Sequence, residues 1–261
     1  MMKKFLVLAA AAVMGLSAQA QAEYKYGFGS MYLDYQHWRD GANPITGPGG
    51  QDRASGRNQA VLGLEGGAGF SWGEVYGFYD HENIGTAGEK EKTSVKGSAH
   101  IYLGDSGLSA YGQFYNHANA NASEHNQVLG LGYTGLAGKG WFFKPWIGMH
   151  QIHKRENYGS AFNYSGDNGY MAGWSAMYRF NEDWSFVNWN EIEFDRAKEV
   201  AAVEGGDSSI QGAAIIFYHL TQNFKMGVQY RYFENKLGVF GSSSGTQHYG
   251  DALIYRIAYD F

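Results

Sequence analysis

The amino-acid sequence predicts an all-β protein, a 12-stranded antiparallel transmembrane β-barrel of the bacterial outer membrane. Three observations support this fold class. Polar and apolar residues alternate with a period of two through most of the chain. Aromatic residues make up 16% of the sequence and can form interfacial girdles. Beyond the N-terminal segment, no apolar run is long enough for a membrane helix, and the mean hydropathy is −0.40.

The last stretch, residues 249–261, carries the clearest alternation. Five apolar or aromatic residues fall on one side of an extended strand, namely Leu253, Tyr255, Ile257, Tyr259 and Phe261. The other side carries Arg256 and Asp260. A strand with one lipid-facing and one water-facing side has this pattern. Because a sheet in lipid cannot leave an edge open, we expect this strand to pair with the first one.

Residues 1–22 resemble a secretory signal peptide. Lys3 and Lys4 precede an apolar run that ends at Leu16, and small residues at alternate positions lead to Ala22. The run is shorter than the about 20 residues that a membrane anchor needs. We therefore expect cleavage after Ala22 and a single barrel domain over residues 23–261.

Charge and composition exclude several function classes. The formal net charge is −5, and loss of the two lysines of the signal makes the mature chain more acidic, so no basic nucleic-acid surface is expected. Cysteine is absent, which excludes disulfides, thiol nucleophiles and thiolate metal sites. No cofactor and no metal are expected. The composition is also compatible with a soluble β-protein. The alternation of polar and apolar residues favours the membrane barrel over that alternative.

Twelve segments carry the strand pattern. The predicted strands are 30–38, 58–68, 74–81, 93–103, 108–117, 127–135, 141–151, 168–180, 184–195, 209–219, 224–233 and 249–261. In the first, Met31, Leu33 and Tyr35 are expected to face lipid, and Tyr32 and Asp34 the lumen.

Two of these strands have an ambiguous polarity. In 74–81, Tyr76 and Phe78 share a side with Asp80, so either face could be the outer one. The segment 184–195 is mixed, with Asn188 and Asn190 on one side and Glu191 close to that side, and we expect a β-bulge there.

Short and long connections alternate along the chain, as in outer-membrane barrels. Five short ones are assigned to the periplasmic side. Six longer ones are assigned to the extracellular side: 39–57, 82–92, 118–125, 152–167, 196–207 and 234–247.

Three motifs suggest chemistry but have simpler interpretations. Residues 69–73 match G-x-S-x-G, yet that motif requires a helix after the turn, and here a strand is expected. Residues 130–135 match G-x-G-x-x-G, but they lie within a predicted strand rather than opening a helix. His150 and His153 lie three apart, so on a strand they face opposite sides and do not share a metal.

The inward-facing charged and aromatic residues are the candidate solute-binding residues of the lumen. They are Tyr32, Asp34, Glu65, Asp80, Lys96, His100, Tyr102, Tyr111, Tyr115, Lys144, His150, Arg179, Arg231 and Arg256. Such charges are costly in a dry core, so they either line water or pair into a plug-like network. The combination suits a solute with a flat ring and a polar, uncharged sugar, although inward aromatic side chains also fill a lumen without binding anything.

Two neighbouring segments resemble a known family. The sequence VLGLEGG at 61–67, followed by Phe70 and by VYGFYD at 75–80, is similar to a strand pair of the nucleoside-specific outer-membrane channels, the Tsx-like family. The resemblance continues loosely through 127–133, 141–149 and the terminal phenylalanine, but the LEGG continuation and the Gly-rich loops depart from the family pattern. Only Glu65, Tyr76, Tyr79 and Asp80 can be aligned with positions of the family's strand pair.

The resemblance implies a monomeric twelve-stranded barrel that passes nucleosides, surrounded by outer-membrane lipid. It also implies that the outer loops could serve as phage or colicin receptors. The hypothesis is thus a passive nucleoside channel without catalysis.

Two alternatives stay open. An outer-membrane lipid hydrolase would need a Ser–His pair at the outer rim. A closed barrel would act only through loops such as 39–57 and 235–247, and measuring conductance would distinguish it from a channel.

Overall fold

The computed structural model describes residues 22–39, 58–85, 91–157, 162–236 and 249–261. The predicted signal peptide, apart from its last residue, lies outside the described residues. So do nearly all of the loop 39–57 and most of the loop 235–247.

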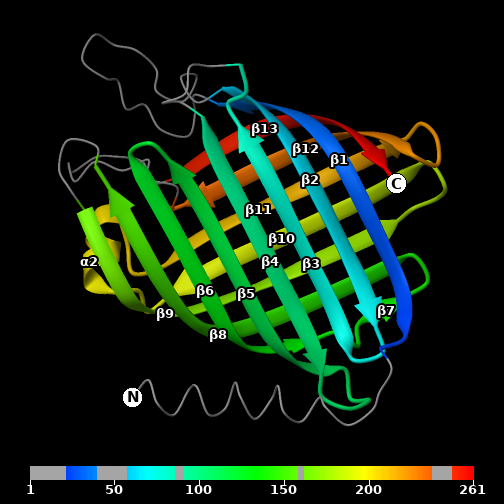
Figure 1. Cartoon of the computed structure of the whole chain (residues 1–261), viewed down its shortest axis with the longest axis horizontal. Coiled ribbons are helices and arrows are strands. Elements are labelled where there is room, and N and C mark those ends of the chain that lie inside the picture. The colour runs from blue at the N-terminus through cyan, green and yellow to red at the C-terminus, as the bar shows by residue number, and fades with distance from the viewer. Residues whose placement is uncertain (1–21, 40–57, 86–90, 158–161, 237–248) are drawn as a thin grey trace.

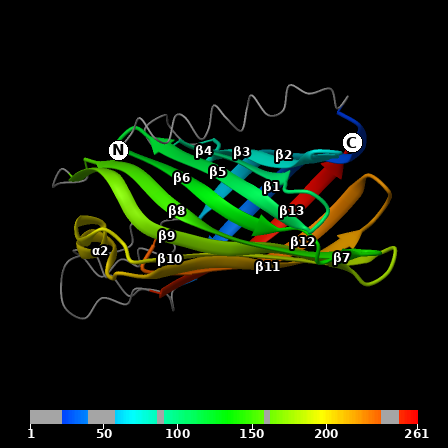
Figure 2. The ribbon, with the colours of Figure 1, turned by 90° about the horizontal axis from the view of Figure 1, so that it is seen from below.

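Twelve long antiparallel strands form a closed barrel in the described part of the chain (Figures 1 and 2). They are β1 (Tyr24–Trp38), β2 (Gln59–Phe70), β3 (Gly73–Glu82), β4 (Lys92–Tyr102), β5 (Leu108–Asn119), β6 (Ala122–Tyr133), β8 (Trp141–Glu156), β9 (Phe162–Arg179), β10 (Trp184–Phe194), β11 (Ser209–His219), β12 (Phe224–Glu234) and β13 (Tyr249–Asp260). The two-residue β7 (Ala137–Gly138) pairs with the start of β8.

The first and last long strands close the barrel. β1 pairs antiparallel with β13 from Ser30↔Asp260 to Trp38↔Ala252, which confirms the expected closure. Every other long strand pairs with its sequence neighbours. The wall therefore leaves no strand edge open to lipid, as a membrane-spanning sheet requires.

The period-two alternation separates the two faces of the wall as expected. On β1, Leu33 is 42% exposed on the outer face while the neighbouring Tyr32 is 3% exposed inside. On β13, Tyr255 faces outward and Ile254 inward. Outward aromatic side chains also gather near the short turns, where rings pair as Tyr178–Phe180, Trp184–Tyr218 and Phe224–Tyr259. Such a band matches the interfacial girdle of membrane barrels.

The structure resolves the polarity of β3. Val75 and Tyr79 are exposed on the outer face, so Tyr76, Phe78 and Asp80 point into the lumen.

The bulge expected in β10 is wrong. This strand pairs in continuous register with both neighbours. Its polarity is mixed because both faces carry polar residues: Glu191 points inward, while Asn188 lies on the outer face. There the Trp174 indole Nε1–H donates to Asn188 Oδ1 at 2.7 Å, and the Asn188 amide donates to the Ala213 carbonyl at 2.8 Å. Internal hydrogen bonds therefore satisfy this polar side chain in the wall.

Two of the expected extracellular loops are largely strand. β5 and β6 extend to a two-residue turn in place of the loop 118–125, and β8 and β9 extend into 152–167. The pairing of β6 with β8 continues to Ala122↔Glu156. In this region both wall faces carry polar side chains, such as Lys154 inside and Arg155 outside, so the apolar alternation disappears although the ladder continues.

The expected loop 196–207 contains the helix α2 (Lys198–Glu204), at the end of the barrel where the longer connections lie (Figure 1). No helix in the described ranges is long and apolar enough to cross a lipid bilayer.

Candidate functional site

The lumen contains an arginine held by carboxylates from two other strands. Arg256 on β13 donates to both carboxylate oxygens of Asp34 on β1, at 2.7 and 2.8 Å, and to Glu65 on β2 at 3.3 Å. Its guanidinium lies 3.5 Å from the centroid of the Tyr32 ring. The bidentate geometry and the ring contact together fix the orientation of the guanidinium.

The neighbouring strands extend this group with hydroxyl–carboxylate hydrogen bonds. The Tyr32 hydroxyl donates to Asp80 on β3 at 2.5 Å, and the Tyr76 hydroxyl donates to Glu65 at 3.0 Å. Tyr32 reaches Asp80 across Gly63 of β2, where an added Cβ would lie 2.2 Å from the Tyr32 ring. A glycine is therefore required at the point where the ring crosses the strand.

Aromatic rings continue along the same wall. Tyr76 stacks with Phe28 at a centroid distance of 6.3 Å and meets Phe78 edge-on at 6.5 Å. This aromatic–acidic wall, defined as Tyr32, Glu65, Tyr76, Phe78 and Asp80, lies on β1–β3. It presents ring faces and hydrogen-bond acceptors side by side.

A second group of lumen residues comes from β4 and β10–β12. Arg231 lies 4.5 Å from the Trp189 ring centroid and donates to Gln211 at 2.7 Å. Lys96 lies 5.8 Å from the same ring and forms an ion pair with Glu191. On the ladder, Lys96 is directly opposite Phe78, which joins this group to the aromatic–acidic wall.

Other predicted site residues are packed inside the adjoining part of the barrel, on β4, β5 and β8. His100 bonds to Ser109 Oγ at 2.8 Å and packs against Tyr111, whose ring stacks on Trp146 at a centroid distance of 4.6 Å. Tyr111 donates to Gln113 at 2.6 Å.

Three more predicted site residues have partners of different kinds, and a fourth lies near a strand end. Lys144 pairs with Glu74 at 2.6 Å. Tyr115 bonds to Ser94 at 3.3 Å, and the buried His150 bonds to Asn126 at 2.7 Å. Tyr102 is half-buried near the end of β4.

Arg179 lies apart from the other candidates. It is exposed at the end of β9, where its guanidinium donates to the backbone carbonyls of Asn181 at 3.2 Å and Glu182 at 2.8 Å. These carbonyls belong to the short turn before β10. Arg179 therefore lies at the rim of the barrel and not with the lumen group that surrounds Arg256.

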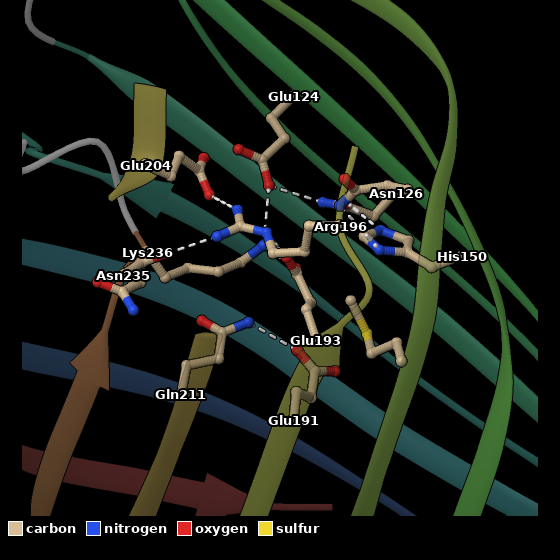
Figure 3. A network of polar contacts seen from close by, with 12 residues as sticks. Glu124, Asn126, His150, Glu191, Glu193, Arg196, Glu204, Gln211, Asn235 and Lys236 are labelled. Carbon is tan, nitrogen blue, oxygen red and sulfur yellow. Dashed lines mark hydrogen bonds and ion pairs between the residues drawn. The ribbon is translucent and has the colours of Figure 1, made fainter. Parts of the chain in front are cut away.

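A network that the sequence did not predict lies at the end of the barrel that carries α2 and the longer connections, the end expected to be extracellular (Figure 3). Glu204 of α2 is fully buried and binds Lys154 of β8 and Arg196. Because α2 contributes this carboxylate from inside the barrel mouth, the network attaches the helix to the wall.

Lys236, which follows β12, joins the same network. It binds Glu193 of β10 and lies 3.6 Å from Glu124 of β6. Burial alone would lower the pKa of Lys236, but the carboxylates of Glu193, Glu124 and Glu204 outweigh that effect and raise this pKa. Lys236 therefore remains charged. The sequence contains one indication of this network. Glu193 lies two residues after Glu191 and therefore points into the lumen from the same strand.

The three motifs that suggested chemistry lie in turns and strands. Ser71 lies in the hairpin turn between β2 and β3, and its Oγ accepts a hydrogen bond from the Glu23 backbone N–H at 3.2 Å. Residues 130–135 lie in β6 and the turn after it, and His150 is buried while His153 is exposed. The described residues contain no group of three or more side chains able to hold a metal ion.

Comparison with known proteins gives a family match. Residues 30–261 match the family of the nucleoside-specific channel-forming protein Tsx. The fold is similar to that of the NanC porin, with 11% identity, 88% of this chain and 98% of that chain covered, and a TM-score of 0.55. An outer-membrane channel from Pseudomonas putida F1 aligns with 10% identity over 94% of this chain and 100% of that chain, with a TM-score of 0.45. The closed barrel with its apolar outer face and the family match together identify a passive channel of the bacterial outer membrane.

Proposed function

Because the chain belongs to the nucleoside-specific channel-forming Tsx family, we propose that nucleosides diffuse through its lumen and bind transiently along the aromatic–acidic wall. The observation that carries this proposal is the placement of the Phe78 ring between Tyr76 and Asp80 on one lumen-facing strand. Any flat base can stack on the face of an aromatic side chain, whichever base it is. The hydroxyl groups of the sugar can donate hydrogen bonds to carboxylates.

The charges of this wall are compatible with an uncharged solute. Arg256 forms ion pairs with Asp34 and Glu65, so its guanidinium is not free to bind a phosphate. Glu65 and Asp80 each accept a tyrosine hydroxyl and keep further acceptor capacity for a solute hydroxyl. Several weak contacts suit a channel better than one tight site, because a bound solute must leave again.

We infer that the protein acts as a monomer surrounded by outer-membrane lipid, without catalysis. The hydrolase alternative has no supporting observation, since the motif serine lies in the short hairpin between β2 and β3 with its Oγ bonded to backbone. Conductance through the protein would argue against the closed-barrel alternative.

The test is single-channel conductance of the refolded protein in a planar bilayer, with adenosine, thymidine and free ribose titrated in. We expect nucleosides to block the current and ribose to have little effect. Phe78→Ala should weaken the block about tenfold, because stacking of a base on an aromatic ring contributes about 1–3 kcal/mol.

Phe114→Ala is the matched control, since Phe114 faces outward on β5. It should leave the block unchanged. Equal block by nucleosides and ribose would refute the nucleoside proposal while leaving a channel for another solute. An absence of current would refute the conducting path itself.

A further inference from the structure

Ion pairs cross the lumen at three levels. Near the short turns, Lys144 of β8 binds Glu74 of β3. Further along the barrel, Lys96 of β4 binds Glu191 of β10. In the order of strands around the wall, neither pair joins neighbours, so both must span the interior.

The third level lies at the extracellular mouth. Lys236, after β12, binds Glu193 of β10 and lies 3.6 Å from Glu124 of β6, with Arg196 and Glu204 completing the network (Figure 3). Between its two ends, the Lys144–Glu74 pair encloses β4, β5 and β6, and the mouth network spans β8 and β9 between β6 and β10. The middle pair, from β4 to β10, separates β5, β6, β8 and β9 from the remaining wall.

The interior on that side is packed. Tyr111, Val128, Trp146 and Met171 form a buried cluster there, with exposed fractions of 5%, 0%, 8% and 2%. Gln113 joins this cluster to the middle ion pair, because it accepts the Tyr111 hydroxyl and donates to Glu191 at 2.9 Å. Side chains packed to this degree leave no room for a solute to pass.

The other side of the middle ion pair is more accessible. The Lys96 side chain is 17% exposed and that of Glu191 9%. Phe78, Trp189 and Arg231 are half-buried, and Lys96 and Arg231 both lie over the Trp189 ring. The accessible lumen side chains therefore lie on β3, β4, β10 and β12.

We propose that these ion pairs partition the barrel into a packed half and a conducting half, and that Lys96 and Glu191 determine the charge selectivity of the conducting half. The path then runs along β12, β13 and β1–β3, and Lys96 and Glu191 lie at its edge. Glu191 holds the Lys96 ammonium in place and neutralises it. Removing either charge leaves the other at the edge of the path without compensation.

The first experiment measures the zero-current potential of the refolded protein in a salt gradient, so it requires no nucleoside. Glu191→Gln should shift selectivity towards anions, because Lys96 becomes uncompensated, and Lys96→Met should shift it towards cations. Arg155→Gln removes a charge from the outer face of β8 and should leave the potential unchanged. No shift in either variant, or shifts in the same direction, would overturn the proposal.

The second experiment leaves the ion pairs intact and uses the absence of cysteine from the chain. The variant Phe78→Cys carries a single cysteine in the conducting half. This cysteine should react with a membrane-impermeant methanethiosulfonate reagent, and the reaction should reduce the current. Met171→Cys, in the packed half, should not react. Reaction at equal rates, or at Met171→Cys alone, would overturn the partition even if the charge variants failed to fold. Both readouts remain informative if the solute is not a nucleoside.

Discussion

At the scale of single residues, Gly63 allows the contact between Tyr32 and Asp80. An added Cβ would lie 2.2 Å from the Tyr32 ring and 2.5 Å from Asp80 Oδ1, which is closer than side chains tolerate. Gly63→Ala should therefore displace the ring and lower the free energy of unfolding by about 1–3 kcal/mol. Urea unfolding in detergent, followed by tryptophan fluorescence, measures the change.

Gly112→Ala provides the control for that substitution. Its Cβ would meet only Leu129, at an ordinary 3.7 Å. We expect no loss of stability, since alanine also restricts the unfolded chain. Equal destabilisation by both substitutions would show that the strand backbone, and not the tyrosine contact, requires glycine.

The inward positions of Tyr32, Asp34 and Arg256 could be predicted from the sequence because a strand alternates strictly between two faces. The importance of Glu191 could not. Asn188 makes the outer face of its strand polar too, and polarity alone then fails to identify the lumen side. The binding roles predicted for the lumen residues stay predictions until transport is measured.

At the scale of elements, the existence of each long strand was predictable, but the lengths of β6 and β8 were not. Beyond the lipid, water reaches the outer face, so selection for apolar residues there disappears. The ladder nevertheless continues through pairs such as His125↔His153. Hydrophobic periodicity reports the membrane-embedded part of a strand and not its hydrogen-bonded length.

The helix α2 contributes one buried carboxylate, Glu204, to the network at the barrel mouth. Glu204 binds both Lys154 and Arg196, so Glu204→Gln leaves two cations in the network with one negative charge fewer. Breaking a buried pair in this way typically costs about 3–5 kcal/mol. We expect faster cleavage by a protease added to the extracellular side, at the segment that contains α2.

Glu199→Gln tests whether any charge change in α2 has this effect. Glu199 is exposed in the first turn of the helix, where its loss removes only a favourable dipole interaction of about 0.3–1 kcal/mol. The segment that contains α2 should therefore remain nearly as resistant to the protease as in the unaltered protein. If Glu204→Gln is cleaved no faster than Glu199→Gln, the network does not hold the helix.

At the scale of the whole molecule, closure between β1 and β13 could be predicted, because lipid tolerates no open sheet edge. The identity of the cross-lumen partners could not. Which residue of β4 lies opposite which residue of β10 depends on the strand number and stagger of the closed barrel, and no local pattern encodes these. Lys96 and Glu191 are separated by 95 positions in the chain and meet only after closure.

Closure within one chain predicts a specific cross-link. Leu33 and Ile257 are directly opposite each other on the outer face of the β1–β13 pair. Cα atoms of directly opposed residues lie about 4.5–5.5 Å apart, within the range of a disulfide. Because the chain contains no cysteine, Leu33→Cys combined with Ile257→Cys offers a single possible pair.

Mild oxidation of this double variant in detergent should give an intramolecular disulfide that changes its migration in a non-reducing gel without doubling its mass. The combination of Leu33→Cys with Leu129→Cys is the control, because Leu129 lies on β6, far around the wall from β1. It should stay reduced. A cross-linked dimer from the first pair would mean that the two strands meet between copies, which would contradict both closure within one chain and the monomeric channel.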